Sequence, residues 1–326
     1  MQTPGMLLIT GLAGGAIERA TNFARMAEAR GFRSFLVNEA ASDALALTQH
    51  LASTTSRIQV GTAIFNIYLR PPLLAALQAL TIDAIAPGRL FLGLGTSHAM
   101  LNQAYGLPMD KPLTALRMYI NTMNSVFRGE HPGLAQMAAM GRPVPRAERK
   151  LPIFLAGVSP KSIQLTGEIA DGGIPAQYGP HMLQEVVDGI AIGARRAGRS
   201  PQDVTLAPVV LCCVCADRGV ALRSVRQQLA FYAQMPFYNR IFARHGFAQE
   251  AESIMAAAMK GDRDGAAAAV SERMVEECAI MGTPQGCVKQ AEAFEKAGAS
   301  YVILSPMAID GDADRGVRAA LEAFAR

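Results

Sequence analysis

The sequence lacks the long apolar runs and the blocks of like charge that mark membrane proteins and nucleic-acid-binding proteins. Its longest apolar stretch, residues 204–216, has thirteen residues and contains Pro208, whereas a helix that spans a membrane needs about 20 residues. The 31 basic and 27 acidic residues leave a net charge of +4 without a run of five like charges, so nucleic acid is not an expected partner. The first residues show neither the basic region nor the apolar region of a signal peptide. We therefore expect a cytoplasmic protein.

Cysteine and histidine are too few and too scattered to indicate a metal centre. The chain has five of each, and Cys212, Cys213 and Cys215 fall within one predicted strand. Adjacent strand residues point to opposite faces, so these thiols do not converge on one ion without a bulge. We interpret the cysteines as structural filler, and no H-E-x-x-H or G-x-S-x-G motif is present.

A strand, a helix and a second strand follow one another in residues 57–98. Residues 58–65 (IQVGTAIF) form a nearly continuous apolar run, which is typical of a strand buried on both faces. Pro71 and Pro72 predict the start of a helix, and a second apolar run ends in Thr96, Ser97 and His98. Such a unit makes a right-handed crossover between parallel strands, and ligands bind at the carboxyl ends of these strands.

The same alternation can be counted eight times, which predicts an α/β fold, a (β/α)8 TIM barrel, as a single domain over residues 1–326. Residues 130–150 lose periodicity and gather proline, which indicates a surface excursion. Residues 220–280 are too long for one barrel helix and indicate a helical insertion after strand seven. A doubly wound sheet is the alternative. The predicted strands span residues 6–10, 34–38, 58–65, 89–98, 152–156, 172–176, 204–215 and 299–305.

Glycines follow the first and fourth predicted strands without forming a dinucleotide-binding fingerprint. Gly11, Gly14 and Gly15, and likewise Gly93 and Gly95, do not match G-x-G-x-x-G. Gly93 and Gly95 serve either close packing inside the barrel or the approach of a cofactor to the backbone.

Two further positions have a structural and a functional interpretation. The loop 157–159 leads into a helix that starts at Pro160, so its N–H groups and the Ser159 hydroxyl indicate either a phosphate site or an ordinary N-cap. His98 ends a barrel strand, where a histidine is either catalytic or structural.

Six segments, in a constant order, resemble the luciferase-like monooxygenase superfamily, whose barrel enzymes bind FMN or the deazaflavin coenzyme F420. The resemblance extends over nearly the whole chain and is greater for the deazaflavin-dependent branch than for the two-subunit luciferases. The segments are EARGFRSFLV, TSRIQVGTAIF with LRPP, ALTIDAIAPGRLFLGLGTSH, AYGLPMDKP with VFRGE, LPIFLAGVSPKSIQLTGEIADGG and IMGTPQGCVKQAEAFEKAGASYVILSP.

The resemblance implies a set of cofactor contacts. A cis peptide bond between Ala63 and Ile64 would form a bulge behind the flavin ring. Lys161 would lie near the polyanionic tail of coenzyme F420, or would be an ordinary solvated helix residue. The implied contacts with the ring are Gly95, Thr96 and Ser97, and those with the phosphate are Gly157, Val158 and Ser159.

The resemblance also implies a reaction, which is hydride transfer between coenzyme F420 and an organic acceptor. His98 stands where the sugar-phosphate and alcohol dehydrogenases of the family carry a glutamate acid, and Asn38 and Glu39 replace their acidic residue and histidine. These differences argue against those two activities. We hypothesise that His98 donates a proton and that Asn38 holds the substrate.

Two other functions remain open at this stage. One is monooxygenation with O2 by reduced FMN, which a separate flavin reductase would supply, and the other is non-catalytic flavin binding. A homodimer is implied by the family. The residues expected on the substrate side indicate an apolar or aromatic small molecule, and they are Met100, Tyr105, Tyr178, Phe237 and Tyr238.

Overall fold

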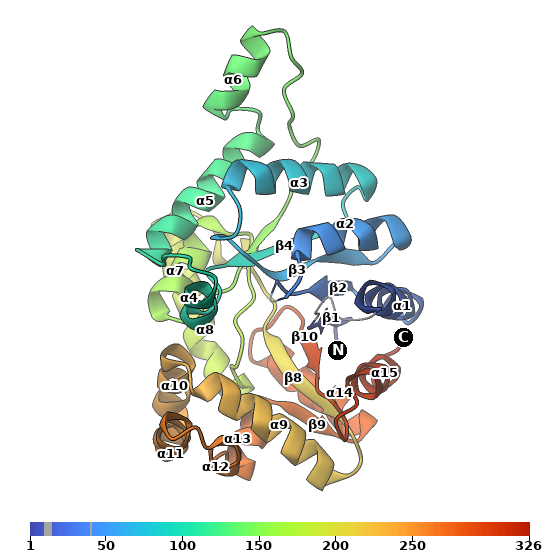
Figure 1. Cartoon of the computed structure of the whole chain (residues 1–326), viewed down its shortest axis with the longest axis vertical. Coiled ribbons are helices and arrows are strands. Elements are labelled where there is room, and N and C mark those ends of the chain that lie inside the picture. Colours follow the sequence, from blue (N-terminus) through green and yellow to red (C-terminus); the bar gives the residue numbers. More distant parts are fainter. Residues whose placement is uncertain (10–14, 40) are drawn as a thin grey trace.

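Ten strands pair in a single parallel sheet in the computed structural model, which describes residues 1–9, 15–39 and 41–326. Their order is β7-β6-β5-β4-β3-β2-β1-β10-β8-β9. The sheet curls round on itself, because β1 pairs with both β2 and β10 and Ala176, after β6, forms a parallel bridge with Val209 of β8 (Figure 1). The strands are β1 (Gly5–Leu8), β2 (Ser34–Val37), β3 (Gln59–Asn66), β4 (Leu90–Gly95), β5 (Ile153–Leu155), β6 (Gly172–Gly173), β7 (Thr205–Leu206), β8 (Val209–Val214), β9 (Ile280–Gly282) and β10 (Ile303–Pro306).

Helices surround the sheet (Figure 1), and several of them begin at a proline, whose missing N–H costs nothing in the first helical turn. Within the described residues, none of them has both the length and the apolar character needed to cross a membrane. The helices are α1 (Ala16–Ala29), α2 (Ala44–Thr54), α3 (Pro72–Ile85), α4 (Ala99–Ala104), α5 (Pro112–Phe127), α6 (Pro132–Ala139), α7 (Pro160–Ile169), α8 (Leu183–Arg196), α9 (Arg218–Ala233), α10 (Pro236–Phe242), α11 (Ala248–Met259), α12 (Arg263–Ala268), α13 (Glu272–Cys278), α14 (Pro284–Lys296) and α15 (Ala313–Ala323), with short turns η1 (Pro180–Met182), η2 (Pro201–Asp203) and the π-helical η3 (Ala243–Phe247).

Apolar side chains fill the space that the curled sheet encloses. Because strand residues alternate between faces, Leu36 points into this inner cluster while Phe35 and Val37 pack outward under the helices. Phe91 and Phe154 stack inside with ring centroids 4.0 Å apart. A filled interior leaves the strand ends as the place for a binding site. The inner cluster consists of Leu7, Leu36, Ala63, Phe91, Phe154, Ile174, Ala207, Tyr301 and Ile303.

Strands β3 and β4 approach so closely that two glycines are required. A Cβ atom added to Gly61 would lie 1.8 Å from the carbonyl oxygen of Phe91, and one added to Gly93 would lie 2.2 Å from that of Thr62. Close packing therefore explains Gly93. At Gly95 the nearest atom would be the Ile64 Cδ1 at 3.0 Å, so packing is less tight at the carboxyl end of β4.

The strand boundaries differ from the sequence-based expectation in several places. The strands expected at 89–98 and 172–176 end earlier, at Gly95 and Gly173, and β9 was not predicted. The strand expected at 204–215 is divided into β7 and β8, because Pro208 has no N–H for the ladder. The strand expected from Ala299 starts only at Ile303. Of the first expected strand, residues 6–10, β1 covers 6–8, and Thr10, Gly11 and Gly14 lie outside the described residues.

Several helices lie in segments for which the sequence did not predict individual helices. Helices α9 to α13 occupy the stretch between β8 and β9, which was expected to be helical throughout. Helix α4, which directly follows β4, was not predicted. Nor was α6, which lies within the 130–150 excursion and projects from the rest of the molecule (Figure 1).

Candidate functional site

The carboxyl ends of β3 and β4 form a bulged corner. The Ala63–Ile64 peptide bond is cis, as the resemblance implies, and the pairing of β3 with β4 shifts register between Thr62 and Phe65. Ile64 remains partly exposed and packs against the inner cluster. Together with Gly95 it makes a smooth apolar floor at this end of the sheet.

The chain leaves β4 through three half-buried polar residues. Thr96, Ser97 and His98 follow one another there, and Ser97 adopts a left-handed backbone conformation with a φ of 57°. His98 is the N-cap residue of α4, and its carbonyl oxygen accepts a hydrogen bond from the Asn102 N–H at 3.0 Å. The orientation of His98 is therefore tied to the position of α4.

A buried amide pair anchors α4 to the strand ends. The Asn66 Nδ2 donates to the Asn102 Oδ1 at 2.7 Å, and the Asn102 Nδ2 donates to the carbonyl oxygen of Thr96 at 2.8 Å. Both side chains are fully buried, and buried amides are favourable only when they are paired in this way. Neither residue was predicted from the sequence, because their pairing joins positions that are 36 residues apart.

A buried ion pair lies next to this network. The Glu39 carboxylate accepts a hydrogen bond from the Asn66 N–H at 2.7 Å and forms an ion pair with Arg70, which also contacts Asp43 at 3.1 Å. Burial raises the pKa of Glu39, and the N–H of Asn66 and the charge of Arg70 oppose that rise. Glu39 thus holds the bulged end of β3, while its neighbour Asn38 is half-buried at the end of β2.

The loop between β5 and α7 presents backbone N–H groups at the positive end of a helix. Ser159 is the N-cap of α7, because its Oγ accepts from the Ser162 N–H at 3.2 Å and its own N–H donates to the Ser162 Oγ at 2.9 Å. Among the described residues, the N–H groups of Gly157 and Val158 have no acceptor. Lys161 is exposed on the first turn of α7. The N-cap interpretation of Ser159 is correct, and two N–H groups remain for an anion.

His98 lies against two aromatic rings from helices that come much later in the chain. Its ring centroid lies 6.2 Å from that of Tyr232 on α9 and 6.0 Å from that of Tyr238 on α10. Burial lowers the pKa of His98, so the imidazole is uncharged at neutral pH. The ring then offers one N–H as a hydrogen-bond donor.

The substrate-side residues expected from the sequence divide into two groups. Tyr238 lies beside His98, and Tyr178 is buried and donates from its hydroxyl to the carbonyl oxygen of Val158 at 2.9 Å. Met100, Tyr105 and Phe237 are exposed. Tyr232 was not named from the sequence, since its helix face gives no signal that it reaches β4.

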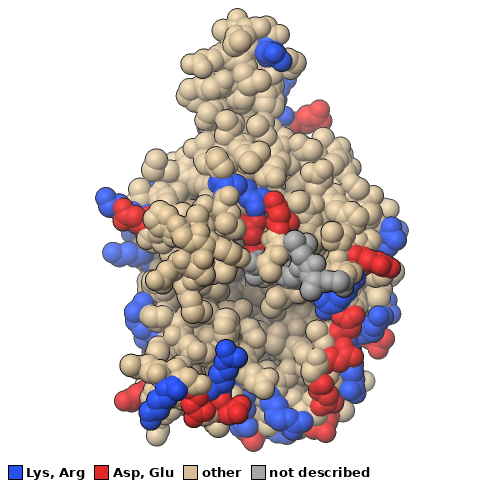
Figure 2. All heavy atoms as spheres, in the orientation of Figure 1, with Lys and Arg blue, Asp and Glu red and all other residues tan. Residues whose placement is uncertain are grey.

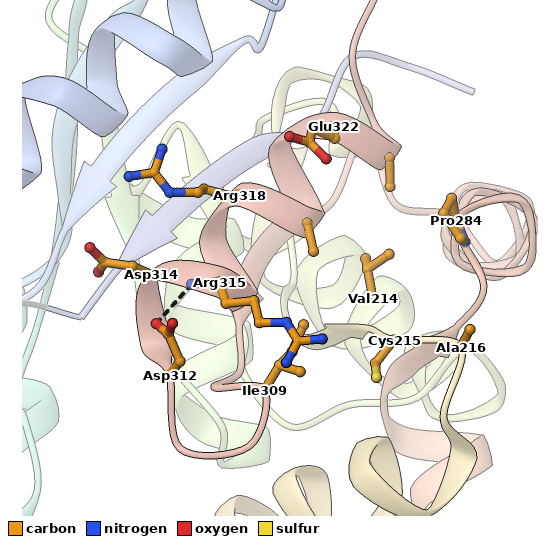
Figure 3. Close-up of a pocket in the computed structure, with 12 residues that line it drawn as sticks. Val214, Cys215, Ala216, Pro284, Ile309, Asp312, Asp314, Arg315, Arg318 and Glu322 are labelled. Atoms are coloured by element: carbon orange, nitrogen blue, oxygen red, sulfur yellow. Dashed lines mark hydrogen bonds between the residues drawn. The ribbon is translucent and has the colours of Figure 1, made fainter.

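A separate open cavity of about 830 Å³ lies between the end of β8 and the helices α14 and α15. Figure 3 shows that its wall carries both basic and acidic side chains, with the Arg315 N–H donating to the Asp312 Oδ1 at 3.0 Å. None of the expected site residues lines it. Within residues 1–9, 15–39 and 41–326, no group of three or more His, Cys, Asp or Glu side chains could hold a metal ion.

A curled parallel sheet with a bulged strand end and a helix N-terminus at the same edge defines an α/β barrel with a candidate ligand site at the carboxyl ends of its strands. The family model described as luciferase-like monooxygenase matches residues 4–301, and the chain belongs to that family of oxidoreductases.

The names of the relatives and solved structures that resemble this chain mention two different cofactors. A Mycobacterium tuberculosis protein named "Putative coenzyme F420-dependent oxidoreductase" is 28% identical over 305 residues, which cover 86% of this chain and 88% of that protein. The structure of the coenzyme F420-dependent tetrahydromethanopterin reductase of Methanopyrus kandleri is similar with a TM-score of 0.81 at 25% identity, covering 98% of this chain and 97% of that one. The oxygenating constituent of 3,6-diketocamphane monooxygenase of Pseudomonas putida, solved with FMN, shares the fold with a TM-score of 0.66 at 16% identity, covering 99% and 95%.

Proposed function

We propose that this chain is a coenzyme F420-dependent oxidoreductase that transfers a hydride between the coenzyme and an organic small molecule. The observation that carries the proposal is the pair of unpaired N–H groups, of Gly157 and Val158, at the start of α7. Such a helix N-terminus suits a phosphate group. The relatives named as F420-dependent favour this coenzyme over FMN.

The residues present fit the shape of a flavin-like group. Ile64 and Gly95 offer an apolar floor for a ring system. A Cβ atom added to Gly95 would lie 3.0 Å from its nearest neighbour, compared with 2.2 Å at Gly93, so there is more space at Gly95. Lys161 lies on the first turn of α7, where its charge would favour an anionic tail. The proposed coenzyme contacts are Ala63, Ile64, Gly95, Thr96, Ser97, Gly157, Val158, Ser159 and Lys161.

The bound deazaflavin would supply the hydride chemistry, and the protein would supply placement and hydrogen bonds. The uncharged His98 donates its ring N–H to the acceptor atom on which negative charge develops, and Asn38 holds the same molecule from the end of β2. The filled barrel interior closes the site from one side and limits the entry of water. We further propose a single barrel domain with an insertion at 220–280, and a cytoplasmic homodimer.

The second candidate is an FMN-dependent monooxygenase that receives reduced flavin from a separate reductase. The shared fold of the FMN-bound monooxygenase component favours it. The loop 157–159 would bind the phosphate of FMN equally well. Contacts with the F420 tail and with the ring system therefore have to distinguish the two coenzymes. A protein that only binds flavin would bind one of them without turning over any acceptor.

Parallel fluorescence titrations of the coenzyme-free protein with F420 and with FMN, in both oxidation states, test the proposal. We expect F420 to bind at least tenfold more tightly than FMN. The exposed Lys161→Glu variant should weaken F420 binding severalfold at low salt, because the helix end then meets the polyanionic tail with a negative charge. Lys260→Glu, which makes the same charge change at the end of α11, is the control. Tighter binding of reduced FMN would favour the monooxygenase, and binding of neither coenzyme would refute the site.

A further inference from the structure

Three aromatic rings from distant parts of the chain meet beside the candidate coenzyme site. His98 comes from the end of β4, and Tyr232 and Tyr238 come from α9 and α10. The tyrosine ring centroids are 5.1 Å apart, and each lies about 6 Å from His98. We call these three residues the ring corner. His98 is three residues beyond Gly95, so the ring corner and the floor formed by Gly95 and Ile64 share the carboxyl end of β4.

The rings are tilted against one another. The interplanar angles are 60° for both pairs with His98 and 68° for the tyrosine pair. Edge-to-face contacts of this kind are favourable because the positive ring edge meets the negative ring face. A planar ring that enters the corner would gain the same kind of contact.

The ring corner carries no charge at neutral pH. Burial lowers the pKa of His98 and raises the pKa of Tyr232 and of Tyr238. The other influences on these three groups are a hydrogen bond with Gln228 and the neighbouring phenol of Tyr178, together with the tyrosines themselves. An ionised ligand would lose its hydration between these three rings, which carry no counter-charge of their own. The cation Arg240 lies outside them, over the Phe237 ring at 4.8 Å from its centroid.

The surface around the ring corner is apolar. Met100 on α4 is 63% exposed, Phe231 on α9 is 43% exposed, and Phe237 on α10 is 51% exposed. Figure 1 shows α4 and α10 on the same side of the molecule. Exposed apolar side chains that gather in one patch are typical of a surface that binds a ligand or a partner.

We propose that the ring corner is the acceptor subsite and that it selects an uncharged, planar ring compound with a hydrogen-bond acceptor. The proposal rests on the proposed function for the reaction itself, and it adds the class of substrate. Tyr232 and Tyr238 determine specificity through their rings. The N–H of His98 meets the carbonyl or ring nitrogen of the acceptor.

Calorimetric titration with two probes that differ only in charge tests the proposal. The probes are 2-naphthamide, which is neutral, and 2-naphthoate, which is anionic at pH 7.5. We expect the amide to bind at least tenfold more tightly than the carboxylate. F420 is included in the titrations if the protein binds it, and its affinity is measured in parallel by fluorescence.

Variants separate a ring contact from a structural effect. Tyr232→Leu and Tyr238→Leu should each weaken 2-naphthamide binding at least tenfold, whereas Tyr232→Phe, which keeps the ring, should change it less than twofold. Tyr105→Leu, at the exposed residue that follows α4, is the control for loss of a tyrosine outside the ring corner. All variants should keep their F420 affinity, and thermal melting checks that they fold.

Equal or tighter binding of 2-naphthoate would overturn the proposal, and so would unchanged 2-naphthamide binding in both folded leucine variants. If F420 fails to bind while the ring-dependent preference for the amide persists, the proposed function is wrong and the ring corner stands as a site for neutral ring compounds.

Discussion

Arg70 is the counter-ion of a carboxylate that water does not reach. The side chains of Arg70 and Glu39 are 8% and 3% exposed. Arg70→Met would leave the Glu39 carboxylate with only the N–H groups of Asn66 and Ala44. Removing one partner of a buried ion pair costs about 3 to 5 kcal/mol of unfolding free energy, and we expect a loss of about that size at pH 8.

The loss in Arg70→Met should depend on pH in a defined direction. Burial already raises the pKa of Glu39 in the folded protein, and removal of the Arg70 charge raises it further. A group with a raised folded pKa stabilises the fold at low pH, and this contribution disappears as the pH rises through the folded pKa. The difference from the wild type should therefore be smaller at pH 5 than at pH 8 in urea unfolding. Arg142→Met, at an exposed arginine, is the control, and an equal loss at both pH values would contradict the argument.

For individual residues, the sequence predicted where the site residues lie better than it predicted which side chains they contact. Residues 95–98 and 157–159 follow apolar strands directly, so their place at one edge of the sheet could be inferred from the local pattern. The Asn66–Asn102 and Glu39–Arg70 pairs depend on side chains that meet only in the folded chain. The uncharged state of His98 likewise depends on rings contributed by α9 and α10.

Helices α7 and α8 pack against each other through glycines. A Cβ atom added to Gly193 would lie 1.8 Å from the carbonyl oxygen of Gln164, and one added to Gly167 would lie 2.1 Å from that of Ile190. Because backbone atoms cannot move aside as a flexible side chain can, Gly193→Ala should separate the helices. Overpacking of this kind costs about 1 to 3 kcal/mol.

Gly219→Ala is the matched control for Gly193→Ala. Gly219 also lies in a helix, but its added Cβ would lie 3.3 Å from the Asp217 Oδ1, which belongs to a side chain. Alanine there should change the unfolding free energy by less than about 1 kcal/mol. Chemical denaturation of both variants gives the comparison, and an unchanged unfolding free energy in Gly193→Ala would show that α7 and α8 can move apart at little cost.

Proline predicted the start of two helices, and the elements that were missed have physical causes. Helices α3 and α7 begin at the expected prolines. Strand β9 has three residues and exists through its pairing with β8, and so short an element has no periodicity of its own. Helix α4 is mostly exposed and depends on Asn102, so its residues show no apolar stripe.

At the scale of the whole molecule, α6 forms an arm that contributes little to the core. Residues 132–141 contain no charged side chain, and Figure 2 shows the projecting part of the surface as mostly uncharged. Met137 and Met140 are 39% and 76% exposed, whereas Leu134 is 2% exposed.

The two exposed methionines of the arm should be replaceable. The double variant Met137→Ser and Met140→Ser is expected to keep its unfolding free energy within about 0.5 kcal/mol of the wild type, and light scattering should show less concentration-dependent association. Leu134→Ala in the same helix should instead cost about 2 to 5 kcal/mol. A large loss of stability in the double variant would mean that the arm packs against other parts of the protein.

The pairing of β1 with β10 has a consequence for the order of folding. Gly5 and Ile303 are neighbours in the sheet, so the contact that joins these strands spans nearly the entire chain. Until β10 has been synthesised, β1 has a bare edge of N–H and C=O groups on that side, the kind of edge that recruits strands from other molecules. Sheets closed by such distant pairings form slowly, because the ends must meet before the contact stabilises them. During synthesis on the ribosome, the barrel therefore stays open until its last strand emerges, and this interval is when the chain most needs protection from aggregation.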